Sequence, residues 1–107
     1  MKAGHRVHAE LTLTLIDEGG LKAPMPSGTR SLLLRFPVSG HEPLTLGAEV
    51  TAQGQAELAP GADGVRVIVH FWADEASDVA VPGARFAVWY GGREVGRGIV
   101  LEETDSA

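Results

Sequence analysis

The residues of this chain that could do chemistry are spaced in a way that fits no metal-binding or acid–base pattern. Four histidines are scattered along the sequence: His5, His8, His41 and His70. A protein metal site needs three or more converging ligands, and these spacings give no reason to expect convergence. The densest acidic cluster is Asp74, Glu75 and Asp78. It lacks the alternating oxygen ligands and the glycine of a calcium loop, so we predict solvated histidines and a solvated acidic loop.

Potential nucleophiles have no recognisable partners. The chain has no cysteine, and it contains neither a Gly-x-Ser-x-Gly elbow nor a phosphate-binding GxxxxGK[ST] loop. No base stands in a recognisable pattern with Ser27, Ser31, Ser39 or Ser77. We therefore predict no catalytic residues, no cofactor, no metal and no bound nucleotide. A small hydrolase or a metal enzyme with an unrecognised site is kept as a third hypothesis, after the two binding functions given at the end of this subsection.

One segment contains a turn that could also bind an anion. Gly91-Gly92-Arg93 joins two β-rich runs, and its backbone N–H groups could face an anion with Arg93 and Arg97 nearby. The same glycines supply the positive φ angles that a type I′ hairpin turn needs. We favour the plain hairpin turn, because it explains both glycines without a ligand.

The elements that must position these residues are β-strands. Strands are expected at residues 7–16, 30–36, 44–52 with a continuation at 55–58, 65–71, 85–90 and 93–101. In the first of them, alternation places one apolar set on a single face: Val7, Ala9, Leu11, Leu13 and Leu15. Pro37 is expected to end the second strand, residues 73–82 to form a loop or a short helical turn, and residues 102–107 to fray.

This pattern amounts to about six barrel-forming strands with no helical periodicity, which is typical of an antiparallel barrel or sandwich. Closing the sheet removes exposed edges, so an all-β, six-stranded antiparallel barrel is the favoured fold. At 107 residues the chain forms one domain, with a core over about residues 6–103.

Two tryptophans fall on the outward parity of their strands. Trp89 is opposite in parity to Phe86, Val88 and Tyr90, and Trp72 shares its parity with Ile68. Tryptophan is often only partly buried, so these residues could fill a second core or form a contact surface. The sequence leaves both possibilities open.

Composition narrows the class of protein. The net charge of −5 repels polyanions at long range, which argues against a general nucleic-acid binder. The chain has no cysteine, no apolar run typical of a signal peptide and none long enough to span a membrane. We therefore expect a cytoplasmic protein without membrane contact.

Three segments, in order, resemble the third, C-terminal domain of translation elongation factor Tu. They are DEGGLKAPMPSGTRSLLLRF (17–36), ELAPGADGVRVIVHF (57–71) and GARFAVWYGGREVGRGIVLEE (83–103). The last is the closest match, because the family has a similar Arg-Phe-Ala run, Gly-Gly-Arg turn and Gly-x-Gly pair there. The resemblance implies a six-stranded antiparallel barrel that stands without the factor's GTPase domain and second barrel.

In the factor this domain helps to hold the T-stem of aminoacyl-tRNA and supports contacts to its exchange factor. The resemblance keeps a glycine at Gly91 and places Ser39 at a family threonine. The family glutamate before the glycine pair is Tyr90 here, and the family glutamine after Gly-x-Arg is Leu32. Residues 73–82 carry only acidic charges where the family has a basic side chain. We therefore expect a protein partner in preference to tRNA.

The sequence thus predicts a non-enzymatic binding module, related to translation by descent, that engages a protein partner or self-associates. Its predicted binding residues are Tyr90, Gly91, Gly92 and Arg93, followed by Trp89, Trp72 and Arg30. The alternative is an RNA-binding module that keeps tRNA-stem contacts through a basic strip of Arg30, Arg35, Arg93 and Arg97.

Overall fold

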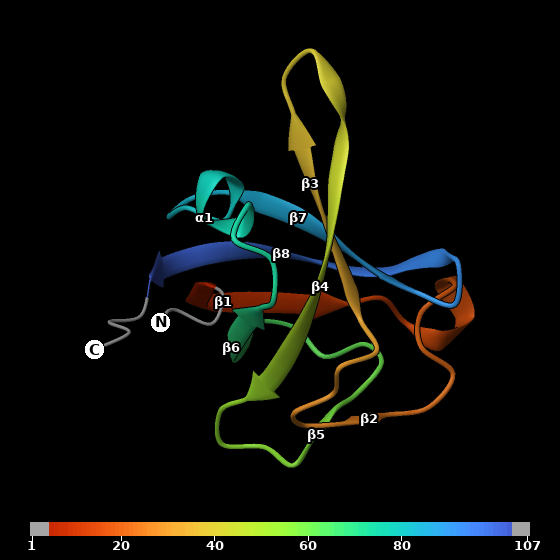
Figure 1. Cartoon of the computed structure of the whole chain (residues 1–107). Helices are drawn as coiled ribbons and strands as arrows, with labels where there is room; N and C mark the ends of the chain where they lie inside the picture. Colours follow the sequence, from red (N-terminus) through yellow and green to blue (C-terminus); the bar gives the residue numbers. More distant parts are fainter. Residues whose placement is uncertain (1–4, 104–107) are drawn as a thin grey trace.

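The computed structural model describes residues 5–103, and antiparallel β-strands dominate it (Figure 1). The strands are β1 (His5–Leu13), β2 (Met25–Pro26), β3 (Leu33–Val38), β4 (His41–Ala52), β5 (Glu57–Leu58), β6 (Val65–Phe71), β7 (Arg85–Tyr90) and β8 (Arg93–Glu103). The helical segments in this range are η1 (Ile16–Glu18) and α1 (Ala76–Val79). A closed barrel forms in the order β1-β6-β4-β3-β7-β8, with every neighbouring pair antiparallel. The six-stranded antiparallel barrel expected from the sequence is confirmed.

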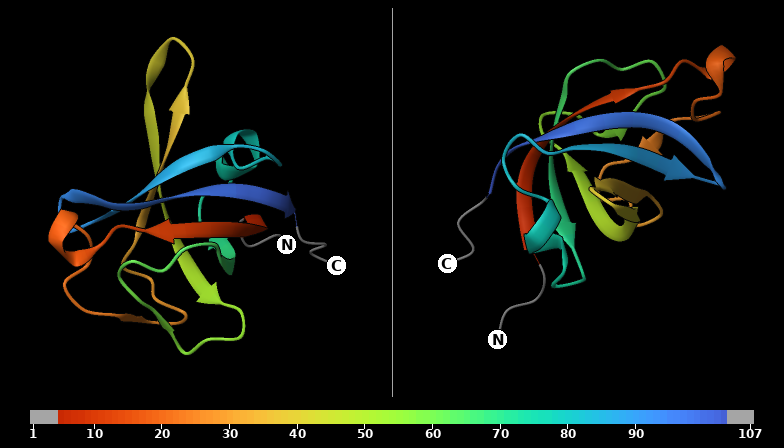
Figure 2. Two further views of the ribbon diagram at one scale, coloured as in Figure 1. Left: turned by 180° about the vertical axis from the view of Figure 1, so that it is seen from behind. Right: turned by 90° about the horizontal axis from the view of Figure 1, so that it is seen from above.

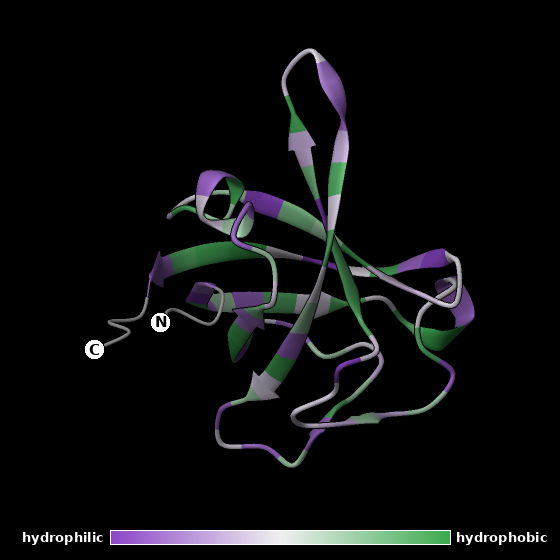
Figure 3. Cartoon of the chain, in the orientation of Figure 1, coloured by the Kyte–Doolittle hydropathy of each residue, from purple (hydrophilic) through white to green (hydrophobic). Residues whose placement is uncertain are grey.

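Side-chain alternation decides which residues fill the barrel. The inward residues of β6 are buried: Val65, Val67, Val69 and Phe71. Arg66 lies between two of them and is exposed, and β4 alternates between hydrophobic and hydrophilic residues in the same way (Figure 3). Three phenylalanines meet inside, since the ring centroid of Phe36 lies 5.8 Å from that of Phe71 and 5.1 Å from that of Phe86. Aromatic rings therefore fill the centre of the barrel.

A glycine on β8 allows the barrel to close around these rings. Gly98 is the register partner of Phe86 on β7 and of Leu11 on β1. A Cβ atom at Gly98 would lie only 2.5 Å from Phe86 Cζ and 2.7 Å from Leu11 Cδ2. Residue 98 must therefore lack a side chain for the three strands to approach one another this closely.

The far end of the β3–β4 hairpin projects away from the barrel as an arm (Figures 1 and 2). The expectation that Pro37 ends the strand was wrong, because β3 continues to Val38. The ladder accommodates the proline with a register shift between Phe36 and Val38. This agrees with the rule that proline, which has no N–H group, is found in strands at bulges or edges. β4 correspondingly starts at His41 rather than at Leu44.

The first strand is shorter than expected. β1 ends at Leu13, and Leu15, predicted to point inward, is 54% exposed. The Leu15 carbonyl accepts hydrogen bonds from the amides of Glu18 (3.0 Å) and Gly20 (2.9 Å), so the chain has already left the sheet for a turn.

Other boundaries also differ from expectation. The strand predicted at 30–36 begins at Leu33, and the one predicted at 55–58 shortens to β5, which pairs with β2 outside the barrel. Glu102 and Glu103 belong to β8 rather than to a frayed tail, because they pair with β1. The remainder of the predicted frayed ends lies outside the described residues. Residues 73–82 contain the short helix α1, as expected.

Adjacent leucines on β3 provide a test of this alternation. Leu34 is fully buried, whereas Leu33 is 45% exposed. Leu34→Ala should lower the free energy of unfolding by about 2–5 kcal/mol, because it leaves a cavity in the core. Leu33→Ala should cost about 1 kcal/mol or less. Urea unfolding of both variants measures the difference, and equal costs would contradict the described orientation of β3.

Candidate functional site

The structure separates the predicted binding residues into two groups. Tyr90, Gly91, Gly92 and Arg93 form the β7–β8 turn region, whereas Trp89 and Trp72 lie on the outer face of the sheet. Arg30 belongs to the second group, because its guanidinium carbon lies 5.4 Å from the centroid of the Trp72 ring.

The hairpin turn has the geometry expected from its glycines. Gly91 has a φ of 63° and Gly92 a φ of 81°, and a type I′ turn requires positive values at both positions. Tyr90 shares the parity of the buried Phe86 and Val88 but is 41% exposed. It is the last residue of β7, and the register shifts between Val88 and Trp89 just before it.

Arg93 fastens this turn to the loop that follows η1. Its Nε donates a hydrogen bond to the Gly19 carbonyl (3.0 Å), and one terminal nitrogen donates to the Gly20 carbonyl (2.9 Å). Arg93 is therefore engaged with the backbone rather than held ready for an anion. A hollow of about 500 Å³ lies between the turn and residues 21–26, lined on the turn side by Tyr90, Gly91 and Arg93.

A row of outward residues crosses four neighbouring segments of the barrel wall. Leu33 on β3 is the register partner of Trp89 on β7 and of Gly47 on β4. A Cβ atom at Gly47 would lie 2.8 Å from Trp72 Nε1, so the indole ring occupies the space that a side chain would need. We call the row Trp89, Leu33, Gly47 and Trp72 the aromatic strip. From β7 over β3 and β4 to β6 there are three strand spacings, which amount to roughly 14 Å.

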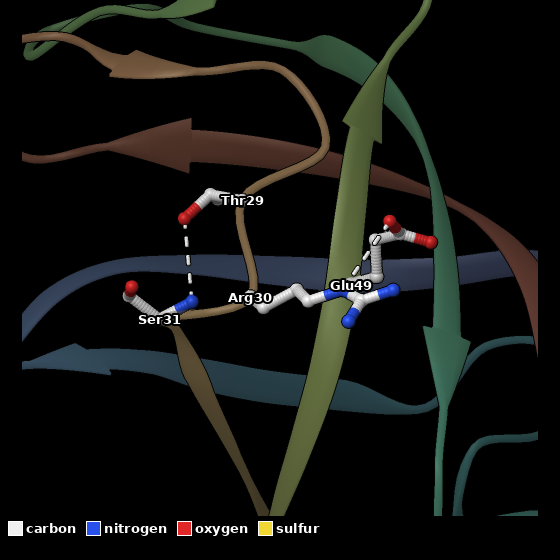
Figure 4. Close-up of polar contacts among 4 residues, drawn as sticks. All are labelled: Thr29, Arg30, Ser31 and Glu49. Atoms are coloured by element: carbon white, nitrogen blue, oxygen red, sulfur yellow. Dashed lines mark hydrogen bonds and ion pairs between the residues drawn. The ribbon is translucent and has the colours of Figure 1, made fainter.

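An arginine stacks over the tryptophan at each end of the aromatic strip. The Arg35 guanidinium carbon lies 3.9 Å from the centroid of the Trp89 ring, and Arg35 Nε donates to Thr45 Oγ1 at 3.2 Å. At the other end Arg30 reaches across β4 toward Glu49, with Nε and Oε2 3.7 Å apart (Figure 4). Cation–π contacts of this kind contribute about 0.5–1 kcal/mol at exposed sites.

The exposed fraction of each side chain shows which part of the aromatic strip faces solvent. Trp72 is 46% exposed and Leu33 is 45% exposed, so the middle and one end of the aromatic strip face solvent. Trp89 is half-buried, and its Nε1 is buried with no hydrogen-bond partner among residues 5–103. Trp72 therefore belongs to the outer surface, whereas Trp89 is partly covered by its neighbours.

Sequence reasoning missed two members of the aromatic strip as surface residues. Leu33 lies in a continuous run with Leu32 and Leu34, both fully buried, so alternation could not identify it. Gly47 has no side chain that would mark it as part of a surface, and its place in the aromatic strip follows only from the Trp72 indole beside it.

The described part of the chain holds neither a cluster of metal-binding side chains nor a membrane-spanning helix. Residues 5–103 contain no group of three or more His, Cys, Asp or Glu side chains placed to hold a metal ion. Neither of the helical segments there, of three and four residues, is long enough to cross a bilayer.

The role of Arg93 can be tested through the loop that it contacts. Arg93→Ala removes both hydrogen bonds to the Gly19 and Gly20 carbonyls, so the amides of these glycines should exchange with deuterium faster. The free energy of unfolding should fall by roughly 1–2 kcal/mol. Arg97→Ala is the matched control, because Arg97 is exposed and makes no such contacts within residues 5–103. Unchanged exchange at both glycines would show that Arg93 does not hold the loop.

No known protein-family model matches the chain, and no curated protein matches it. Its function is therefore inferred from geometry. Within residues 5–103, the predicted binding residues lie at the hollow beside the β7–β8 turn and on the aromatic strip.

Proposed function

We propose that the chain is a non-enzymatic binding module that engages a protein partner through the aromatic strip. The observation that carries the proposal is the exposure of Leu33 and Trp72, each nearly half exposed. Leu33 is the register partner of Trp89, and the Trp72 indole lies beside Gly47, the other register partner of Leu33. Exposed apolar residues gathered in one place mark contact surfaces, whereas single exposed apolar residues do not.

The composition of this surface supports a protein partner. Tryptophan and arginine are enriched among the residues that dominate binding energy at protein interfaces. Here two tryptophans lie beneath Arg30 and Arg35, with Leu33 between them. Covering a large aromatic side chain removes much apolar area from water, which favours association.

The rigidity of the surface supports the same proposal. Leu33, at the centre of the aromatic strip, is paired on both sides in the closed barrel, with Gly47 on β4 and with Trp89 on β7. Such a scaffold fixes the side chains before a partner arrives, which lowers the entropic cost of binding.

The relationship to the third domain of elongation factor Tu is part of this proposal, as is a cytoplasmic location. A closed six-stranded antiparallel barrel supports it at the level of fold. In that factor the outer surface of the barrel packs on other protein domains, so the outer surface of a similar barrel is suited to contact with protein.

Matched substitutions of exposed residues test the proposal. Leu33→Glu places a charge in the middle of the aromatic strip, whereas Ile16→Glu places one at an equally exposed apolar residue in η1. Both residues are exposed, so both variants should stay folded. Proteins captured from native lysate by the wild type should be retained by Ile16→Glu and lost with Leu33→Glu. The same captured set with all three forms would reject the aromatic strip as the binding surface.

Tryptophan fluorescence gives a second readout on purified protein. The chain has two tryptophans, and both belong to the aromatic strip. A partner, or a second copy, that covers the strip should shift their emission to shorter wavelengths. A shift that grows with protein concentration, together with a larger sedimentation coefficient, would identify the partner as a second copy of the chain.

A tRNA stem is the weaker candidate partner. Of the four arginines expected to form a basic strip, Arg30 contacts Glu49 and Arg93 holds two backbone carbonyls. Binding to RNA would weaken steeply with salt, because it releases condensed counterions. Gel shifts with a tRNA stem at low and moderate ionic strength should show no complex. A salt-sensitive complex that Arg97→Glu abolishes would favour RNA over protein.

A further inference from the structure

A second hollow opens beside the aromatic strip, where β3 leaves β7. The register pairs of these strands end at Arg35 and Ala87, and the β3–β4 arm then turns away from the barrel (Figure 1). The hollow has a volume of about 240 Å³. Its lining residues are Arg35, Pro37, Pro43, Arg85, Phe86 and Ala87. We call it the arginine hollow.

Two arginines line the arginine hollow, Arg35 and Arg85, and a third, Arg97, lies on the neighbouring strand β8. Arg35 and Arg97 flank Ala87 as its register partners on β3 and β8, and Arg85 shares the outward face of β7 with Ala87. Among residues 5–103 none of the three arginines forms an ion pair, whereas Arg30 pairs with Glu49 and Arg66 with Glu10. This is a local concentration of positive charge in a chain of net charge −5.

The floor between the cations is apolar. Pro37 and Pro43 come from the arm, while Phe86 and Ala87 come from β7. A cavity of about 150 Å³ is large enough to bind benzene. The arginine hollow is larger, at about 240 Å³, so one leucine or phenylalanine side chain fits it.

We propose that the arginine hollow binds an acidic segment of the protein partner. An apolar side chain of that segment occupies the floor, and its neighbouring carboxylates contact Arg35, Arg85 and Arg97. The planar guanidinium group matches a carboxylate with two parallel hydrogen bonds, which a lysine cannot do. This inference rests on the proposed function, and it specifies the chemistry of the partner next to the aromatic strip.

Charge and shape favour a peptide over a nucleic acid here. A phosphate backbone would leave the apolar floor of prolines and Phe86 unused. A long polyanion would also meet the net negative charge of the whole chain. A short acidic segment responds to the three nearby arginines, because screening limits the field to about 10 Å at moderate salt.

Fluorescence anisotropy with short labelled peptides tests the proposal on the full chain. The probe is a fluorescein-labelled peptide of alternating glutamate and leucine, and the comparison peptide has glutamine in place of glutamate. We expect the acidic peptide to bind at least about tenfold more tightly than the glutamine peptide. Arg85→Glu should weaken binding of the acidic peptide by about tenfold, and Arg85→Lys by less, since it keeps the charge but loses the planar fork.

The control substitution is Arg66→Glu. Arg66 is an exposed arginine on β6, away from the arginine hollow, and its replacement changes the net charge by the same amount. Binding of the acidic peptide should be preserved in this variant. An equal loss with Arg66→Glu and Arg85→Glu would show a general field effect and would overturn the assignment to this hollow.

Two further results would overturn the inference in different ways. Binding of a labelled single-stranded oligonucleotide, without binding of the acidic peptide, would show that the three arginines serve nucleic acid. No binding of either probe, with Leu33→Glu still abolishing capture of protein from lysate, would reject the acidic segment while the proposed function stands. Loss of both the peptide complex and the captured protein in Arg85→Glu would support the two proposals together.

Discussion

In a closed sheet every strand must turn about half of its side chains outward, and the rest of this structure depends on that constraint. The inward half is used for stability, since Phe36, Phe71 and Phe86 fill the centre of the barrel. The side chains that face solvent therefore come from the outward half of the strands and from the segments that leave the sheet. The aromatic strip is of the first kind, and the β3–β4 arm is of the second.

Stacked arginines make it easier for such a surface to exist in water. Arg35 covers one face of Trp89 and Arg30 lies over Trp72, so each indole ring has a charged neighbour in place of some solvent. Leu33 lies between them without such a cover. The apolar centre of the surface is thus framed by cations at both ends, which resembles the arrangement of an apolar core and a polar rim at protein interfaces.

Local patterns in the sequence predicted what depends on local geometry. The alternation of β6 and the glycine pair of the β7–β8 turn each follow from neighbouring residues, and the structure has both. Contacts between distant residues could not be predicted in this way. Arg93 finds its carbonyl partners more than seventy residues away, at Gly19 and Gly20. Likewise the outward position of Leu33 depends on its pairing with β4 and β7, because the run of leucines around it carries no alternation.

The projecting arm affects whether copies of the chain associate with one another at high concentration. Residues 36–38 of β3 and 41–47 of β4 extend beyond the pairing with β7 and β6, which covers residues 33–35 and 48–52. Unpaired strand borders of this kind can form hydrogen bonds with a strand of another chain, and repetition of that step leads to fibrils. Each border contains a proline, Pro37 or Pro43, which cannot donate to an incoming ladder. The arm can therefore extend into solvent without acting as a template for stacking.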